Sequence, residues 1–145
     1  MKIQRIDHVG VIVRDLAAAK AFFIDFGLEV LGEGELAAAW IDRVVGLDGV
    51  KVAFVMLRTP DGQANIELIT FYSPSDDRAI QQPSANTLGI RHIAFVVEDI
   101  EAVVARLKKN GAETFSEIQQ FEDSYKLCYV RGPEGMIIEL AEQIN

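Results

Sequence analysis

Two histidines and two glutamates have the types and surroundings needed to hold a metal ion. His8 and His92 are the only histidines in the chain, and each lies in an alternating run of apolar residues. Glu67 and Glu139 each interrupt another apolar run as a lone carboxylate. Imidazole nitrogens and carboxylate oxygens bind zinc and similar ions at about 2.0–2.2 Å. Because two carboxylates balance a dication, the four residues predict one divalent-metal site.

The two halves of the chain repeat one another. His8, Asp15, Leu16 and Gly27 return 84 residues later, as the matching set His92, Asp99, Ile100 and Gly111. A spacing conserved over twenty residues indicates a duplicated module. The repeat therefore gives the two histidines equivalent positions.

The four residues could also have purely structural roles. A histidine in an apolar strand is more often a hydrogen-bonded core residue than a ligand, and a strand glutamate usually faces solvent. Glu67 and Glu139 have apolar neighbours on both sides, however, and an unpaired buried carboxylate is costly. Either both glutamates face water or a positive group neutralises them. Their coincidence with the duplicated histidines favours a metal ion.

Each histidine run is predicted to be a β-strand. β-Branched and aromatic residues alternate with others over residues 6–13 and 90–97. The two-residue period of a strand puts His8 on the same face as Gly10, and His92 on the same face as Ala94. The two imidazoles are thus expected at matching positions of two sheets.

A helix is predicted directly after each of these strands. Asp15 and Asp99 can accept hydrogen bonds from the first free backbone N–H groups of a helix. Gly27 and Gly111 can take the left-handed conformation that ends one. Each segment carries one apolar stripe at helical spacing, which would cover one face of a sheet.

Each half then contains a predicted hairpin whose second strand carries the glutamate. The first hairpin joins 52–57 to 65–71, and the second joins 126–130 to 136–141. The pattern therefore brings one histidine strand and one glutamate strand into each half.

Two stretches are less regular. Residues 32–49 could contain a short helix over 37–45 that lies over a pocket, and 73–88 have the proline and serine content of a connection. We expect one domain over residues 1–145, made of two modules at about 1–72 and 89–145 and joined by the linker 73–88.

The remaining reactive side chains carry weaker signals. Cys128 lies in a predicted strand with no spare histidine to activate it, so it is interpreted as a small buried apolar residue. No glycine-rich nucleotide-binding motif is present. Five arginines are potential anion clamps, although most surface arginines are solvated: Arg14, Arg43, Arg58, Arg91 and Arg131.

Composition argues against nucleic acid and membrane partners. The chain has 145 residues and a formal net charge of −8, which repels phosphate backbones and anionic lipid surfaces. The start of the sequence lacks the apolar core of a signal peptide, and a single cysteine allows no internal disulfide. We therefore expect a cytoplasmic protein.

The four metal-ligand segments resemble those of the vicinal oxygen chelate superfamily. This family includes glyoxalase I, methylmalonyl-CoA epimerase, bleomycin and fosfomycin resistance proteins and extradiol dioxygenases. The resemblance covers nearly the whole chain: residues 6–10 and 91–95 look like the family's two histidine strands, and residues 65–68 and 137–140 like its two carboxylate strands. It implies an α+β fold in which two tandem βαβββ modules form cup-shaped mixed sheets with helices outside.

The resemblance also implies an activity. With two histidines and two glutamates, the chain is similar to glyoxalase I in all four ligand types, which favours the isomerase and epimerase branch. The implied reaction is metal-dependent proton transfer next to a chelated carbonyl of a small, thiol-conjugated or free metabolite, with Glu139 or Glu67 as general base. The implied ion is nickel, zinc or cobalt, with manganese or iron as alternatives, and the implied assembly is a homodimer.

Two departures leave other functions open. Glyoxalase I holds glutathione with an arginine and an asparagine where this chain has Ile12 and Phe71. Acyl-CoA epimerases share the pattern but commonly have a second histidine where this chain has Arg91. The alternatives are therefore an acyl-CoA epimerase and a resistance protein that binds an antibiotic or another small ligand without turnover.

Overall fold

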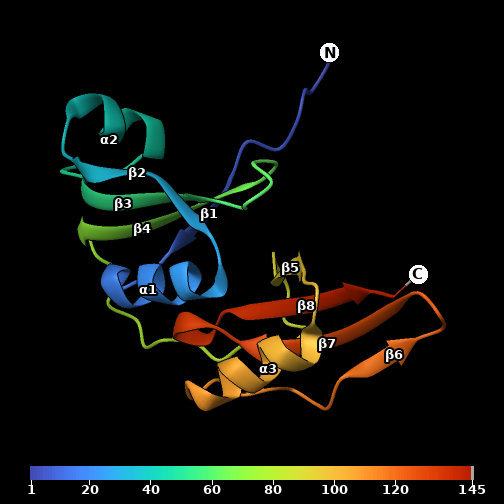
Figure 1. Ribbon diagram of the computed structural model, residues 1–145. Coiled ribbons are helices and arrows are strands. Elements are labelled where there is room, and N and C mark those ends of the chain that lie inside the picture. Colours follow the sequence, from blue (N-terminus) through green and yellow to red (C-terminus); the bar gives the residue numbers. More distant parts are fainter. Residues whose placement is uncertain (145) are drawn as a thin grey trace. The chain divides into compact units, whose positions relative to one another are not determined.

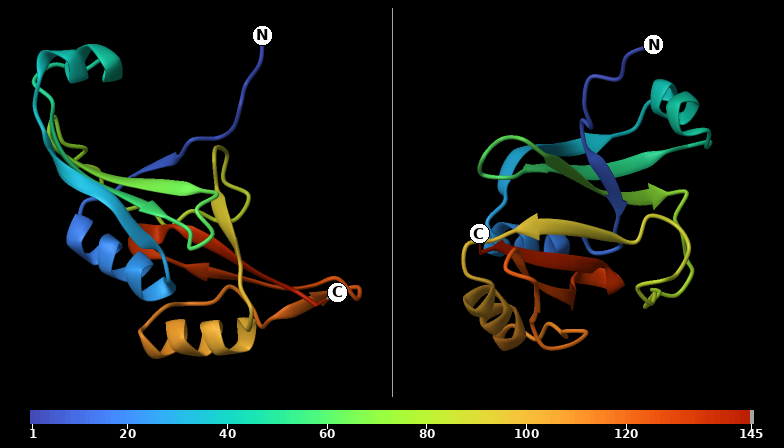
Figure 2. Two further views of the ribbon diagram at one scale, coloured as in Figure 1. Left: turned by 45° about the horizontal axis from the view of Figure 1, so that its top comes forward. Right: turned by 90° about the vertical axis from the view of Figure 1, so that its right-hand side faces the viewer.

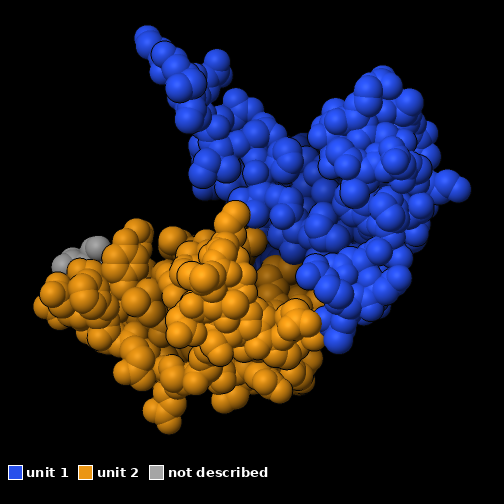
Figure 3. All heavy atoms as spheres, turned by 180° about the vertical axis from the view of Figure 1, so that it is seen from behind, with its two compact units in different colours: residues 1–79 blue, residues 80–145 orange. Residues whose placement is uncertain are grey.

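The computed structural model describes residues 1–144, which form three α-helices and eight β-strands in two four-stranded sheets (Figures 1 and 2). The chain divides into two compact units, Met1–Ala79 and Ile80–Asn145 (Figure 3). Each unit contains one of the two sheets. The boundary lies within the predicted linker 73–88. The α+β class and the two βαβββ modules predicted from the sequence are confirmed.

Unit 1 contains a mixed sheet, one helix in the crossover and a second short helix. Its sheet has the order β1-β4-β3-β2, with β1 parallel to β4 and the other neighbours antiparallel. The elements are β1 (Val9–Ile12), α1 (Leu16–Phe26), β2 (Glu29–Leu36), α2 (Ala39–Val45), β3 (Lys51–Arg58) and β4 (Asn65–Ser73).

Unit 2 repeats this topology without the second helix. Its sheet has the order β5-β8-β7-β6, and β5 is parallel to β8 as β1 is to β4. The elements are β5 (His92–Val96), α3 (Ile100–Lys109), β6 (Gln119–Phe121), β7 (Tyr125–Arg131), the 3₁₀ turn η1 (Pro133–Gly135) and β8 (Ile137–Gln143).

The predicted N-terminal caps of the two crossover helices and the closing glycine of α1 are present, whereas α3 ends at Asn110, one residue before the predicted Gly111. The side chain of Asp15 accepts the N–H of Ala18 at 3.0 Å, and that of Asp99 accepts the N–H of Ala102 at 3.1 Å. Gly27 ends α1 with φ 118°, a left-handed value that costs glycine little. These caps determine where each crossover helix begins after its histidine strand, and where α1 ends before β2.

In unit 1, α1 packs on the face of the sheet opposite Glu67. Leu68 and Val55 are buried on this helix face, and Glu33 on the same face is 2.7 Å from Lys20 of α1. The other face carries Glu67, so we call it the glutamate face. Because side chains alternate along a strand, burying Leu68 under α1 necessarily points Glu67 away from the helix.

Unit 2 has the same two faces. Leu140 and Val130 are fully buried on the helix face, where Lys126 of β7 contacts Glu101 of α3 at 2.9 Å. Glu139 therefore lies on the opposite, glutamate face of this sheet.

The short helix α2 covers part of the glutamate face of unit 1. Its Ile41 is buried against Val50 and Val52, with Ile69 and Phe71 packed beside them. Figure 2 shows α2 and α1 on different sides of the sheet. The helix predicted over residues 37–45 is confirmed, although it begins two residues later, at Ala39.

Two strands differ from the sequence prediction. Residues 32–49 were predicted to be irregular, yet β2 continues to Leu36, and the short β6 was not predicted. Both are edge strands in their sheets. In β2, glycines alternate with the exposed Glu33 and Glu35, which is typical of edge strands but lacks the apolar alternation that identifies central ones.

The helices of the described chain are all short. The longest, α1, has 11 residues, whereas about 20 apolar residues are needed to cross a bilayer. Within residues 1–144, no helix combines the length and the apolarity of a membrane span.

Candidate metal centre

In unit 1, the parallel pairing of β1 and β4 brings His8 to Glu67. Gly10 lies opposite Glu67 in the register, and His8 precedes Gly10 by two residues, just before β1 begins. The Nε2 atom of His8 is 3.7 Å from Oε1 of Glu67. The side chains are 37% and 23% exposed, so the pair is accessible and partly desolvated.

Unit 2 repeats this pair in the same register. Ala94 lies opposite Glu139, and His92 precedes Ala94 by two residues at the start of β5. The Nε2 atom of His92 is 3.5 Å from Oε1 of Glu139, with exposed fractions of 38% and 21%. The structure thus brings the four predicted ligands together as two matching pairs, one within each unit.

The spacing within each pair fits two ligands of one metal ion. Hydrogen bonds between nitrogen and oxygen are about 2.7–3.2 Å long, so 3.5–3.7 Å is too long for a good one. Two donors bound to the same ion at 2.0–2.2 Å are separated by about 3.0–3.4 Å. A small side-chain adjustment brings either pair to that separation, and the nitrogen and oxygen donors suit zinc, nickel or cobalt.

Asp7 sets the orientation of the His8 ring. Its Oδ2 lies 2.8 Å from Nδ1 of His8, and this hydrogen bond is the main cause that lowers the pKa of the Asp7 carboxyl. An acceptor at Nδ1 favours the tautomer whose proton is on Nδ1, which leaves the Nε2 lone pair facing Glu67. Carboxylates commonly support metal-binding histidines in this way.

Replacing Asp7 with asparagine is expected to lower the affinity of the protein for zinc by about 10-fold. Supporting partners of metal-bound histidines contribute about 10–100-fold, and the exposed position of Asp7 favours the lower end. Titration calorimetry with zinc measures the change. The matched control is Asp61→Asn, which removes another exposed, hydrogen-bonded aspartate in the 59–64 turn. Equal affinities of both variants and the parent would contradict the role of Asp7.

Tyr129 adds a hydroxyl to the second pair that the first pair lacks. Tyr129 lies opposite Glu139 in the β7–β8 register, and its ring centroid is 5.1 Å from that of His92. Burial, and then the charge of Glu139 and a hydrogen bond to it, raise the pKa of the Tyr129 phenol. The corresponding position opposite Glu67 is Met56, which has no hydroxyl. The two histidine–glutamate pairs are therefore chemically different.

Neither Asp7 nor Tyr129 was predicted from the sequence as part of the site. Tyr129 could have been found by extending the predicted hairpin register across its turn, since that register pairs residue 129 with 139. Asp7 could not have been found in this way, because the alternation of a strand puts Asp7 and its neighbour His8 on opposite faces. It reaches Nδ1 of His8 because β1 begins only at Val9 and the preceding backbone is irregular.

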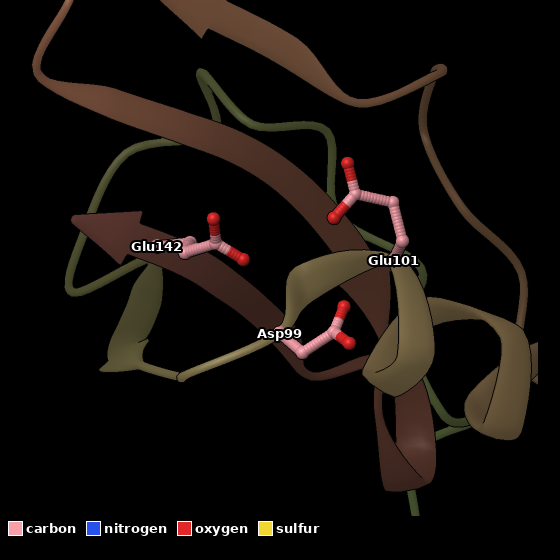
Figure 4. A group of neighbouring side chains, drawn as sticks. All are labelled: Asp99, Glu101 and Glu142. Atoms are coloured by element: carbon pink, nitrogen blue, oxygen red, sulfur yellow. The ribbon is translucent and has the colours of Figure 1, made fainter. Parts of the chain in front are cut away.

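Three acidic side chains of unit 2 also converge, at the start of α3 (Figure 4). Each carboxylate already has a structural partner. Asp99 caps α3, Glu142 accepts the N–H of Ile100 at 2.9 Å, and Glu101 binds Lys126 at 2.9 Å, a contact that lowers the pKa of Glu101. The cluster holds the helix on its sheet and lies on the helix face, away from Glu139.

Cys128 is buried on the helix face of unit 2, as predicted, with 3% exposure. Burial raises the pKa of its thiol, which keeps the sulfur protonated and unreactive. The residue therefore contributes packing.

Residues 7–129 match the sequence profile of the Glyoxalase/Bleomycin resistance protein/Dioxygenase superfamily. Because the match spans most of the chain and the fold agrees, the protein belongs to this superfamily, the vicinal oxygen chelate family. Members typically bind a metal ion and small molecules, and they include metal-dependent enzymes as well as binding proteins.

Particular relatives are similar over their full lengths. A glyoxalase family protein from Bacillus cereus is 41% identical, with a TM-score of 0.95, 100% of this chain and 97% of that chain being covered. The Bacillus subtilis (strain 168) protein YwbC is 32% identical over 97% of this chain and 98% of its own. The fold is also shared with TnmS3, an antibiotic binding protein from Streptomyces sp. CB03234, at 17% identity and a TM-score of 0.65, which covers 99% of this chain and 98% of that one.

Proposed function

We propose that this protein is a divalent-metal-dependent isomerase or lyase of the glyoxalase type. It transfers a proton next to a carbonyl of a small oxygenated metabolite, either free or conjugated to a thiol. The observation that carries the proposal is the pair of equivalent histidine–glutamate contacts, 3.7 Å and 3.5 Å, on the glutamate faces of the two units.

One ion is proposed to be shared by His8, Glu67, His92 and Glu139. Each unit supplies two donors, fewer than the four that a divalent ion of this kind usually takes. Both pairs are therefore needed, whether they come from one chain or from two copies in a homodimer. When bound, the ion supplies Lewis-acid polarisation of two neighbouring substrate oxygens.

The side chains of the protein then have separate roles. The histidines orient the site, and one glutamate accepts the proton from the carbon next to the carbonyl and returns it to the neighbouring carbon. On the glutamate face of unit 1, Ile12 and Phe71 stand where glyoxalase I has polar glutathione contacts, and Phe71 packs beside α2. An apolar surface at these positions supports a substrate other than glutathione adducts.

Metal removal tests this function. Protein treated with chelator is expected to lose the ability to exchange the α-proton of an α-hydroxy or α-keto thioester with deuterated solvent, as followed by NMR. Addition of nickel, cobalt or zinc should restore the exchange. If a panel of such substrates shows no metal-dependent exchange, the isomerase function is wrong.

A second function, ligand binding without turnover, is supported by the apolar part of the unit 1 glutamate face. Ile69 and Phe71 are half-buried there under α2, and Trp40 of α2 is 54% exposed. The fold is shared with an antibiotic binding protein, TnmS3. Metal content separates the two functions: purified protein that holds no metal but binds a planar apolar ligand tightly would favour the second.

A further inference from the structure

We propose that Arg131, held against Phe115 beside the His92–Glu139 pair, is an anchor for a carboxylate of the substrate. The inference rests on the proposed function and narrows it to 2-oxo or 2-hydroxy compounds that carry a second carboxylate. All of the contacts that carry it lie within unit 2.

The guanidinium of Arg131 is fixed in place without being neutralised. Its Cζ lies 4.6 Å from the centroid of the Phe115 ring, and Nη1 donates to the carbonyl of Gly135 at 3.1 Å. Among the described residues, no carboxylate lies within 4.0 Å of it. A half-buried cation is costly unless an anion accompanies it, and most of the donors of its planar fork are left for one.

Arg131 lies on the same face of the sheet as the His92–Glu139 pair. Arg131 and Tyr129 are two residues apart in β7, so both point to the glutamate face, with Cα atoms about 6.8 Å apart. Tyr129 lies opposite Glu139, and its ring is 5.1 Å from His92 and 5.8 Å from Phe115. An aromatic row therefore connects His92 to the guanidinium, along which a short carbon chain could lie.

The repeat provides an internal comparison. Arg58 of β3 occupies the equivalent place in unit 1, two residues beyond Met56, which lies opposite Glu67. The Nε of Arg58 is 3.4 Å from Oε2 of Glu29 on the neighbouring strand, so this arginine already has a carboxylate partner. Glu113 lies across from Arg131 as Glu29 lies across from Arg58, and its carbonyl accepts the backbone N–H of Arg131 at 2.8 Å. Among the described residues, however, the Arg131 guanidinium forms no ion pair and packs on the Phe115 ring instead.

Two acids of equal chain length test the proposal. 2-Oxoglutarate and 2-oxopentanoate share the 2-oxo acid end and differ only in a terminal carboxylate or methyl group. Calorimetry with the zinc- or nickel-loaded protein is expected to show at least about 10-fold tighter binding of 2-oxoglutarate, as a charge-assisted hydrogen bond provides. The preference should vanish in Arg131→Gln and be reduced in Arg131→Lys, which keeps the charge but loses the planar fork.

The control variant is Arg58→Gln, which removes an equal charge from the other unit and should leave the preference unchanged. Thermal unfolding of each variant confirms that the fold is retained. Equal binding of the two acids by the parent protein, or equal loss of the preference in both glutamine variants, would overturn the anchor while leaving the proposed function intact. Binding of neither acid by the metal-loaded protein would also overturn the anchor, whereas the proposed function fails only if metal-dependent α-proton exchange is absent as well.

Discussion

Replacement of His92 by alanine is expected to lower the affinity of the protein for zinc or nickel by at least about 100-fold. Removing a supporting group of a metal ligand already costs about 10–100-fold, so removing a ligand should cost no less. His92 faces Glu139 on the glutamate face and is 38% exposed, so the truncation leaves no buried cavity that would unfold the unit. Metal content after dialysis and titration calorimetry both measure the change.

His8→Ala is expected to have the same effect, because the two histidines have equivalent positions and similar distances to their glutamates. Val96→Ala is the matched control, since Val96 is 65% exposed on the same face of β5, four residues beyond His92. A single ion shared by both units requires that either histidine variant alone abolishes tight binding. If one variant binds metal normally, the four-ligand site is wrong.

The parts of the fold that the sequence predicted are those with a strong periodic or capping signal. The crossover helices follow from Asp15 and Asp99 and from their apolar stripes, and the structure places both caps as expected. The central strands β3, β4, β7 and β8 are rich in β-branched and apolar residues because both of their faces are partly covered. Strong burial leaves a strong sequence pattern.

The edge strands could not be predicted in the same way. The three residues of β6, Gln119 to Phe121, are all exposed, and β2 alternates glycine with glutamate. Their formation depends on a neighbouring strand that offers free backbone groups, and that dependence is not encoded in local residue preference. The register between strands is likewise a property of the whole sheet.

The residues of the candidate site also differ in how well the sequence predicted them. The histidines and glutamates were predicted because a polar residue in an apolar run stands out, and the duplication marks it twice. Tyr129 carries no such signal, and Arg131 was one of five arginines predicted only as potential anion clamps, because both residue types occur commonly at half-exposed strand positions. The predicted hairpin register could have paired Tyr129 with Glu139, but the contact of its ring with His92 also depends on the pairing of β5 with β8.

The asymmetry at Tyr129 leads to a prediction about which glutamate accepts the proton. The hydroxyl of Tyr129 bonds to Glu139, which occupies one carboxylate lone pair and restricts the side chain. Glu67 lies opposite Met56, whose thioether has no proton to donate, so its carboxylate is freer to turn toward a substrate. Glu67 is therefore expected to act as the general base, while Glu139 remains a fixed ligand.

Glu67→Gln is accordingly expected to lower metal-dependent α-proton exchange by about 100- to 10,000-fold at saturating zinc or nickel, the contribution of a positioned general base. Glu139→Gln should mainly weaken metal affinity, with a loss of exchange at saturating metal at least about 10-fold smaller. Glu101→Gln is the matched control, because this glutamate lies on the helix face with Lys126.

A second variant, Tyr129→Phe, tests the role of the tyrosine. It removes the hydrogen bond that restricts Glu139, so Glu139 can then replace Glu67 as the base. The exchange rates of Glu67→Gln and Glu139→Gln are therefore expected to differ less when each is combined with Tyr129→Phe. A larger loss in Glu139→Gln than in Glu67→Gln would assign the proton transfer to the hydrogen-bonded glutamate instead, and would mean that the tyrosine prepares the base rather than restrains a ligand.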